Sequence, residues 1–200
     1  MKLIIADASP FARKLRVMLH ETGQMEAVEM LTVATTPINT APEVAAANPT
    51  GKIPALIRED GPAIYDSRVI ARYLDARFDA GLYPDARLWE TLTLEATADA
   101  IMDAAVLVTY ETRLRPEDKV FDAWMDAQWE KVSRSVAAVN ARWMSHLAGP
   151  LDMSHIAMGC ALAYLDFRHD ARGWRKENEA LADWFAAFAE RESMKETAPQ

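Results

Sequence analysis

The sequence predicts an α/β unit followed by an all-helical unit. Residues 1–78 alternate short apolar runs with segments of helical spacing, in the order βαβαββα, whereas the residues after 86 show helical spacing with few glycines. Between them lies the segment 79–86, which carries Gly81 and Pro84. We therefore expect domains at 1–78 and 87–200 joined by a linker at 79–86. Half of the chain is apolar (50%), which is enough to build a core.

The first unit shows seven stretches with strand or helix signals. KLIIA predicts a strand, and SPFARKLRVMLHETG predicts a helix that begins at Ser-Pro and ends at Gly. EAVEML predicts a second strand, which the helical crossover makes parallel to the first, and APEVAAAN predicts a short helix. PALIRE and PAIYD predict a hairpin around Asp-Gly, followed by the amphipathic helix SRVIARYLDARF.

The second unit is predicted to contain four helices. They span about 87–113, 119–147, 154–168 and 178–191, with breaks at RPED and GPLD. The segment 154–168 is apolar on nearly all sides, so we expect it in the middle of a helical bundle.

Composition excludes several classes of function. A net charge of -8 repels phosphate backbones and anionic lipid, so nucleic acid and membrane surfaces are not expected partners. Cys160 is the only cysteine, which rules out an internal disulfide, and the four histidines show no zinc-type spacing, so no metal is expected. The apolar run before Asp7 is too short for a signal sequence, which favours the cytoplasm.

The segment NPTGKIPAL suggests a peptide-binding loop. A proline directly before a strand cannot donate a ladder hydrogen bond, and a cis Ile53–Pro54 bond would turn the Ile53 backbone outward. The exposed N–H and C=O could then bond an extended peptide as an extra strand would. An ordinary Pro-Gly loop before an edge strand is the alternative interpretation.

Two helix starts could also bind a ligand. Asp66 and Ser67 stand where a strand becomes a helix, a place where free N–H groups and a hydroxyl favour a bound carboxylate. Ser9 stands before Pro10 at the start of the first helix and could hydrogen-bond a thiol. Taken alone, both sites are more simply explained as plain helix caps, each worth about 1 kcal/mol.

At these separations SPFARKLRVMLHE, NPTGKIPAL and YDSRVIARYL resemble the N-terminal thioredoxin-like domain of the cytosolic glutathione transferases. The helical remainder is similar to the C-terminal domain of that family, so the resemblance covers nearly the whole chain, and it is greatest to bacterial glutathione transferase-like proteins with a Ser-Pro-Phe turn. It implies that Ser9 is the active-site residue and that Ile53, before the cis-proline Pro54, bonds the cysteinyl part of glutathione. It also implies that Asp66 and Ser67 hold the γ-glutamyl end.

The same resemblance implies the remaining contacts. Lys52 would meet the glycyl carboxylate. Phe11 would belong to the glutathione-binding residues, and the acceptor substrate would lie near it, between the domains. The expected acceptor-pocket residues on the helix after the linker are Ile101, Met102 and Ala105. Glu95, Asp99 and Asp103, spaced i, i+4, i+8, would form a solvated face, or one of them would meet the glutamyl ammonium, within the chain or across a dimer interface.

The resemblance implies a cytoplasmic homodimer that acts in detoxification, with glutathione as cosubstrate and no metal. Bound glutathione would be held as thiolate near Ser9 and would attack a small electrophile, and peroxidase or dehalogenase activity would use the same motifs. A non-catalytic glutathione- or protein-binding role is the alternative from another class. The first 78 residues contain no cysteine, so disulfide exchange is excluded.

One departure from the family pattern concerns the start of the apolar helix. Family members carry Ser/Thr-x-x-Asp there, whereas this chain has DMSH, with Asp152 as the cap and His155 in the place of the acid. A protonated imidazole would face the positive end of the helix, so we expect this helix to lose stability near pH 6.

Overall fold

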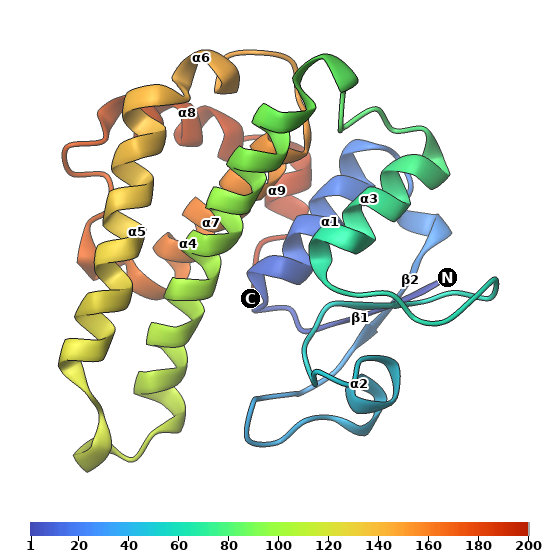
Figure 1. The fold of residues 1–200 in the computed structure, drawn as a ribbon, viewed down its shortest axis with the longest axis horizontal. Coiled ribbons are helices and arrows are strands. Elements are labelled where there is room, and N and C mark those ends of the chain that lie inside the picture. The colour runs from blue at the N-terminus through green and yellow to red at the C-terminus, as the bar shows by residue number, and fades with distance from the viewer. Residues whose placement is uncertain (200) are drawn as a thin grey trace. The chain divides into compact units, whose positions relative to one another are not determined.

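The computed structural model describes residues 1–199, which form two compact units (Figure 1). One unit is Met1–Ala86 together with the C-terminal segment that begins at Glu192, and the other is Arg87–Arg191. The predicted fold class, a thioredoxin-like α/β unit followed by a helical unit, is confirmed. The units differ from the expected domains at the C-terminus, because the last helix joins the first unit.

A three-stranded sheet organises the first unit. Its order is β2-β1-β3, with β1 (Lys2–Ile5) parallel to β2 (Glu29–Thr32) and antiparallel to β3 (Ala55–Ile57). The helices α1 (Pro10–Glu21) and α3 (Ser67–Phe78) lie on one side of it, and α2 (Pro42–Ala47) lies on the other (Figure 1). Helices on both faces explain why three consecutive residues of β1 are buried rather than alternate ones.

The predicted hairpin is shorter than expected. The segment PAIYD forms a single bridge, in which Leu56 and Ile64 exchange two backbone hydrogen bonds of 2.9 Å. Pro62 has no N–H to continue the ladder, and its carbonyl instead accepts a 2.9 Å bond from Arg58 Nε.

The C-terminal segment packs on α1. Arg13, which is 7% exposed, donates from Nη2 to the carbonyl of Met194 (2.8 Å) and from Nε to Thr197 Oγ1 (3.3 Å). The Ser193 hydroxyl donates to the Glu21 carboxylate. These bonds tie α9 (Glu192–Glu196) to the first unit, a connection that the sequence prediction missed.

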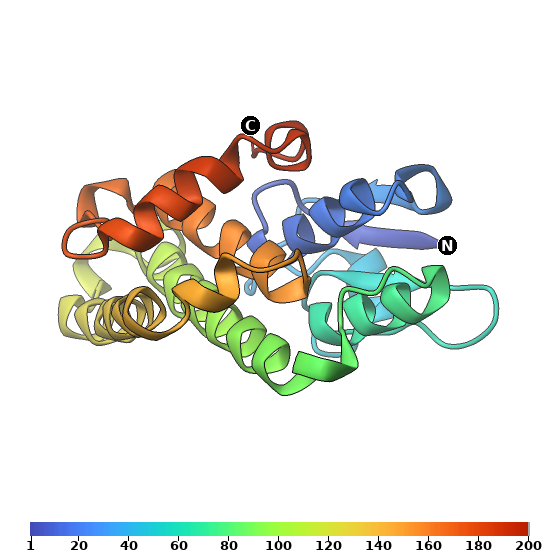
Figure 2. The ribbon, with the colours of Figure 1, turned by 90° about the horizontal axis from the view of Figure 1, so that it is seen from above.

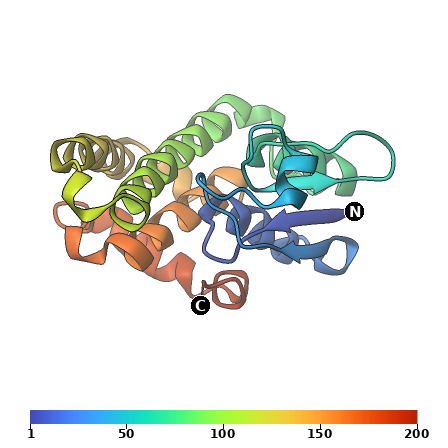
Figure 3. The ribbon, with the colours of Figure 1, turned by 90° about the horizontal axis from the view of Figure 1, so that it is seen from below.

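The second unit is a helical bundle around α7. Its helices are α4 (Leu88–Leu114), α5 (Asp122–Arg142), α6 (Met144–Leu147), α7 (Met153–His169) and α8 (Glu179–Ala189). As predicted for the apolar segment, α7 is almost wholly buried, and it lies between α4 and α8 (Figures 2 and 3). The helix predicted over 119–147 is interrupted at Trp143, which ends α5 and precedes α6.

Four short 3₁₀ helices connect these elements within the described residues: η1 (Met25–Ala27), η2 (Asp85–Arg87), η3 (Glu117–Lys119) and η4 (Asp170–Arg172). Of the helices that the structure describes, none has the length and apolar character needed to span a bilayer.

Candidate functional site

The strand register brings the loop before β3 to the end of β1. Ile4 pairs with Ala55, so continuing the antiparallel register by two residues places Ile53 opposite Ala6. The carbonyl of Ala6 accepts a 2.9 Å bond from the N–H of Ser9, which closes the turn into α1. The Ser9 turn and the Ile53 backbone therefore meet at one edge of the sheet.

The start of α3 lies at the same edge. The bridge between Leu56 and Ile64 is antiparallel, so Asp66 falls opposite Pro54, and the segment before α3 runs in the same direction as β1. The helices α1 and α3 pack side by side and point the same way (Figure 1). All three segments singled out in the sequence thus converge within the first unit.

Ser9 is the N-cap of α1. Its Oγ accepts a 3.3 Å bond from the N–H of Ala12, and Pro10 occupies the first helical turn. Accepting this bond uses a lone pair of the hydroxyl oxygen but leaves the hydroxyl proton available to donate a hydrogen bond. Ser9 is half-buried, and among residues 1–199 its hydroxyl proton meets no acceptor. The cap and a donor to a bound thiol are therefore compatible roles.

The loop at Ile53 is held by Asn48, a residue that sequence reasoning did not single out. Asn48 is 2% exposed, donates from Nδ2 to the carbonyl of Lys52 (2.8 Å), and accepts at Oδ1 from the N–H (3.0 Å) and hydroxyl (2.8 Å) of Thr50. Gly51 follows with φ +68, a conformation that favours glycine. An asparagine before Pro-Thr-Gly was the available signal, because Asn commonly bonds the backbone two residues on.

The Ile53 backbone remains unsatisfied. The Ile53–Pro54 peptide bond is cis, as is Tyr65–Asp66. The Ile53 side chain packs on the small core beneath α2, yet within the described chain neither its N–H nor its C=O has a hydrogen-bond partner. Lys52 is exposed and Phe11 is half-buried.

Asp66 caps α3 and is engaged by Arg68. Its carboxylate accepts from the N–H (3.0 Å) and the guanidinium (3.1 Å) of Arg68, and its side chain is 56% exposed. Partial burial acts to raise the pKa of Asp66, but the hydrogen bond and charge of Arg68 outweigh it and hold that pKa below 3.8. Ser67 is 3% exposed, and its hydroxyl meets no partner in residues 1–199.

The expected acceptor residues on α4 are not surface residues. Ile101, Met102 and Ala105 are completely buried, whereas Asp103 is exposed. A cavity in this unit opens one to two turns further along α4, and none of these four residues lines it.

The expected solvated acidic face is wrong for two of its members. Glu95 is 1% and Asp99 is 5% exposed. Spacing alone could not show this, because i, i+4 periodicity identifies a helix face but not what covers it.

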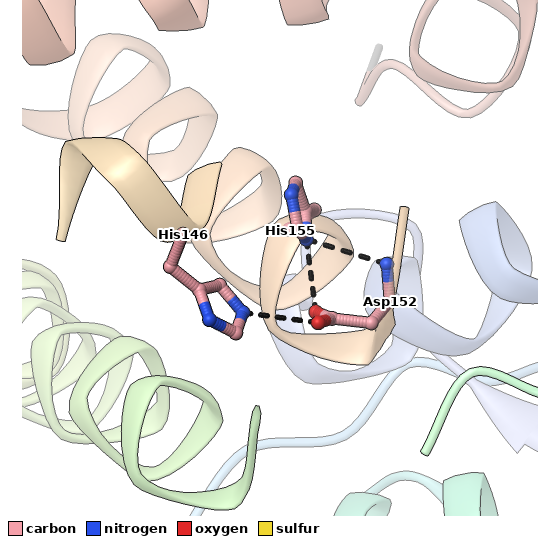
Figure 4. Close-up of side chains that lie close together, drawn as sticks. All are labelled: His146, Asp152 and His155. Atoms are coloured by element: carbon pink, nitrogen blue, oxygen red, sulfur yellow. Dashed lines mark hydrogen bonds and ion pairs between the residues drawn. The ribbon is translucent and has the colours of Figure 1, made fainter. Parts of the chain in front are cut away.

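A polar cluster stands at the start of α7 (Figure 4). The fully buried Asp152 carboxylate accepts from Ser154 N–H (3.0 Å) at one oxygen and from Thr91 Oγ1 (3.1 Å) at the other. His155 Nδ1 lies 2.8 Å from the first oxygen, and His146 Nε2 lies 2.9 Å from the second. The predicted capping box is therefore present. His146 joins the cluster from α6, and sequence spacing did not connect α6 with the start of α7.

The cluster is better explained as a helix cap than as a metal site. One ligand atom from each of His146, Asp152 and His155 lies within 4.8 Å of the others. However, the guanidinium Nε of Arg87 lies 3.4 Å from the Asp152 carboxylate, where it would repel a cation, and both carboxylate oxygens already accept hydrogen bonds.

The same geometry corrects the pH dependence expected for His155. Burial acts to raise the pKa of Asp152, but the bonds from His155 and Ser154 and the nearby imidazoles hold it far below 3.8, so the carboxylate is ionised at neutral pH. A protonated His155 would face this anion at 2.8 Å rather than only the positive helix end. The basis for a loss of stability near pH 6 is therefore absent.

Comparisons with known proteins agree with this architecture. Residues 8–77 match the model for the glutathione S-transferase N-terminal domain, and residues 122–187 match that for the C-terminal domain. The uncharacterized GST-like protein YibF of Escherichia coli K12 is 33% identical over 205 residues, covering 100% of this chain and 98% of YibF.

Solved structures are also similar over the full chain. A glutathione transferase family member from Pseudomonas fluorescens Pf-5, with bound glutathione, has a TM-score of 0.96 at 42% identity, covering 100% of this chain and 98% of that one. A Pseudomonas fluorescens Pf-5 family member with bound S-(propanoic acid)-glutathione gives 0.92 at 41% identity, with 100% of both chains covered. A glutathione S-transferase from Methylobacillus flagellatus with glutathione bound gives 0.85 at 37%, covering 100% and 99%.

Proposed function

The chain belongs to the glutathione transferase family, and on this premise we propose that it binds glutathione at the sheet edge where α1 and α3 begin and transfers it to a small electrophile. The observation that carries the proposal is the unsatisfied backbone of Ile53 beside two helix N-termini. Relatives solved with bound glutathione support the choice of ligand.

The tripeptide suits the three segments chemically. Its cysteinyl backbone can pair with the N–H and C=O of Ile53, two residues before β3 begins, in the way that an added strand pairs with a sheet edge. Its glutamyl carboxylate suits the N-terminus of α3, where Ser67 offers a hydroxyl, and its ammonium suits the ionised Asp66. Lys52 would meet the glycyl carboxylate.

Ser9 is proposed to activate the thiol. A free thiol has a pKa of about 8.5, and lowering it by about two units requires about 2.7 kcal/mol of preferential binding to the thiolate. A hydrogen bond to an ion, worth about 1.5–3 kcal/mol, supplies this amount. The thiol proton leaves to solvent, the thiolate forms a bond to the electrophilic carbon, and the leaving group departs with its electron pair.

A relative with bound S-(propanoic acid)-glutathione supports an open position next to the sulfur. From the family resemblance we further propose a homodimer that acts in the cytoplasm in detoxification, without a metal. Phe11 is proposed to line the acceptor side of the site, where its ring is half-buried.

A binding role without turnover is the second candidate. It is favoured by the hydrogen bond from Ala12 to Ser9 Oγ, since a serine that serves only as a cap needs no chemistry. Fold alone does not separate a transferase from such a carrier.

Two substitutions at Ser9 separate the candidates. Ser9→Ala removes both the hydroxyl and the cap, whereas Ser9→Gly removes the hydroxyl at a cost to the cap of only a few tenths of a kcal/mol. We expect both variants to bind glutathione in calorimetry and to lose turnover of 1-chloro-2,4-dinitrobenzene by tenfold or more, with Ser9→Thr retaining activity. Unchanged turnover in Ser9→Gly would assign Ser9 to the cap alone, and absence of heat with millimolar glutathione would overturn the proposal as a whole.

A further inference from the structure

A cavity of about 350 Å³ lies within the helical unit, and all of its lining residues belong to that unit. It is formed by the C-terminal part of α4, the start of α5 and the end of α7 with η4, toward the lower end of α4 and α5 in Figure 1. Its volume falls at the lower end of the range for small-molecule sites.

Three arginines line this cavity in a chain of net charge -8. They are Arg113 on α4, Arg168 on α7 and Arg172 on η4. Arg172 pairs with the exposed Asp126 at 3.1 Å. In residues 1–199 neither Arg113 nor Arg168 has a hydrogen bond or ion pair. The residues that line the cavity thus include three cations and no carboxylate, against the overall sign of the protein.

Arg168 is unusual because one of its polar atoms is buried without a hydrogen bond in the described chain. Its Nε is buried and has no hydrogen-bond partner in the described chain, and its guanidinium carbon lies 3.9 Å from the centre of the Phe167 ring. Buried polar groups in proteins are nearly always hydrogen-bonded, so each exception calls for an explanation. A ligand with acceptor oxygens, bound in the cavity, would supply the missing hydrogen-bond partner of Arg168 Nε.

Helix ends provide a competing explanation. Arg113 and Arg168 stand in the last turns of α4 and α7, where cations stabilise the negative end of a helix. That role is fulfilled equally well by a solvated side chain. It explains neither the cavity between the helices nor the unpaired Nε of Arg168 inside it.

The rest of the wall is fixed and uncharged. His169 Nε2 must donate to the carbonyl of Ala105 (2.9 Å), since a carbonyl has no proton, and it also lies 3.0 Å from Thr109 Oγ1. Burial lowers the pKa of His169, so this ring adds no charge at neutral pH. Val108, Met125 and Phe167 supply apolar surface next to the arginines.

We propose that this cavity binds a small organic anion whose oxyanion head pairs with the arginines and whose apolar body packs on Val108, Met125 and Phe167. Guanidinium groups match carboxylate and phosphate oxygens with two parallel hydrogen bonds, which would satisfy the Nε of Arg168. The proposal goes beyond the glutathione site and does not depend on it.

Calorimetry of the full chain without glutathione tests the proposal. The probes are phenylacetate and phenyl phosphate, with phenylacetamide as the uncharged counterpart. We expect at least one anion to bind tenfold or more tightly than the amide and to weaken as salt is raised, and the preferred anion identifies the head group. Anions that bind no better than phenylacetamide would overturn the proposal.

Matched variants locate the site. Arg168→Gln and the exposed Arg113→Gln should each weaken anion binding about tenfold, and the latter keeps the test valid if the former does not fold. Arg134→Gln, which removes the same charge from a side chain 69% exposed on α5, should change it less than twofold. Equal losses in all three variants would show a general charge effect and refute the site.

The outcome is separable from that of the glutathione proposal. Ser9→Ala should leave anion binding unchanged. A chain that binds glutathione but no anion overturns only the cavity proposal, and the reverse result overturns only the glutathione proposal.

Discussion

The substitution His155→Asp gives the sharpest test of the cap at α7. The Oδ1 of an aspartate branches from Cγ as the histidine Nδ1 does, so it would take up a position about 2.8 Å from Asp152 Oδ1. The variant replaces the contact between His155 and Asp152 with the repulsion between two buried carboxylates. At a separation of about 4 Å and an effective dielectric constant of about 20, their repulsion is about 4 kcal/mol.

The guanidinium of Arg87 reduces this repulsion between the two carboxylates. Arg87 lies 3.4 Å from the Asp152 carboxylate with its own side chain 27% exposed, so part of the repulsion is screened. We expect His155→Asp to lower the free energy of unfolding by about 3 kcal/mol at pH 7, measured by urea denaturation. His155→Asn is the matched control, since its amide can donate to Asp152 without a charge, and it should stay within about 1 kcal/mol of the natural chain.

The pH dependence follows from the same pair. Two adjacent carboxyls raise one pKa, so the folded variant binds a proton more readily than the unfolded one, and its stability rises as pH falls. The gap between His155→Asp and His155→Asn should therefore shrink between pH 7 and about 5. Equal unfolding free energies for the two variants at pH 7 would refute the electrostatic account of this cap.

A double variant checks the geometry independently. Asp152→Ser with His155→Asp rebuilds a Ser-x-x-Asp capping box and removes one of the two anions. It should recover part of the loss of His155→Asp, though not all, because Arg87 and His146 lose the carboxylate that they contact.

Two further predictions concern the helical unit. Asp152 has a lowered pKa, so its contribution to stability is complete above about pH 4 and is lost as pH falls toward the folded pKa. Urea midpoints at pH 4, 3 and 2 should therefore decline more steeply for the natural chain than for Asp152→Asn. Parallel declines in the two proteins would contradict this prediction. Gly159→Ala should destabilise the chain by about 1–3 kcal/mol despite the better helix propensity of alanine, because a Cβ there would lie 2.6 Å from Phe188 Cδ1. Adding Phe188→Leu should relieve the clash in thermal unfolding, and stabilisation by Gly159→Ala alone would exclude it.

The sequence determined the local parts of this protein. Helical and strand spacing give the order of elements in both units, and Ser9 and Asp66 at helix starts follow from short-range rules for caps. The capping box at Asp152 and His155 was also visible, because its partners are three residues apart. Such features depend on neighbours in the chain, whose separation fixes their geometry.

Tertiary structure decided the remainder. His146, one of the partners of the Asp152 cap, comes from α6, and the last helix packs on α1 through Arg13. The unpaired Arg168 shares a cavity with residues of α4 and α5. Periodicity states which residues share one helix face, but the partner of that face depends on how separate helices pack. For this reason the burial of Glu95 and Asp99 could not be foreseen from their spacing.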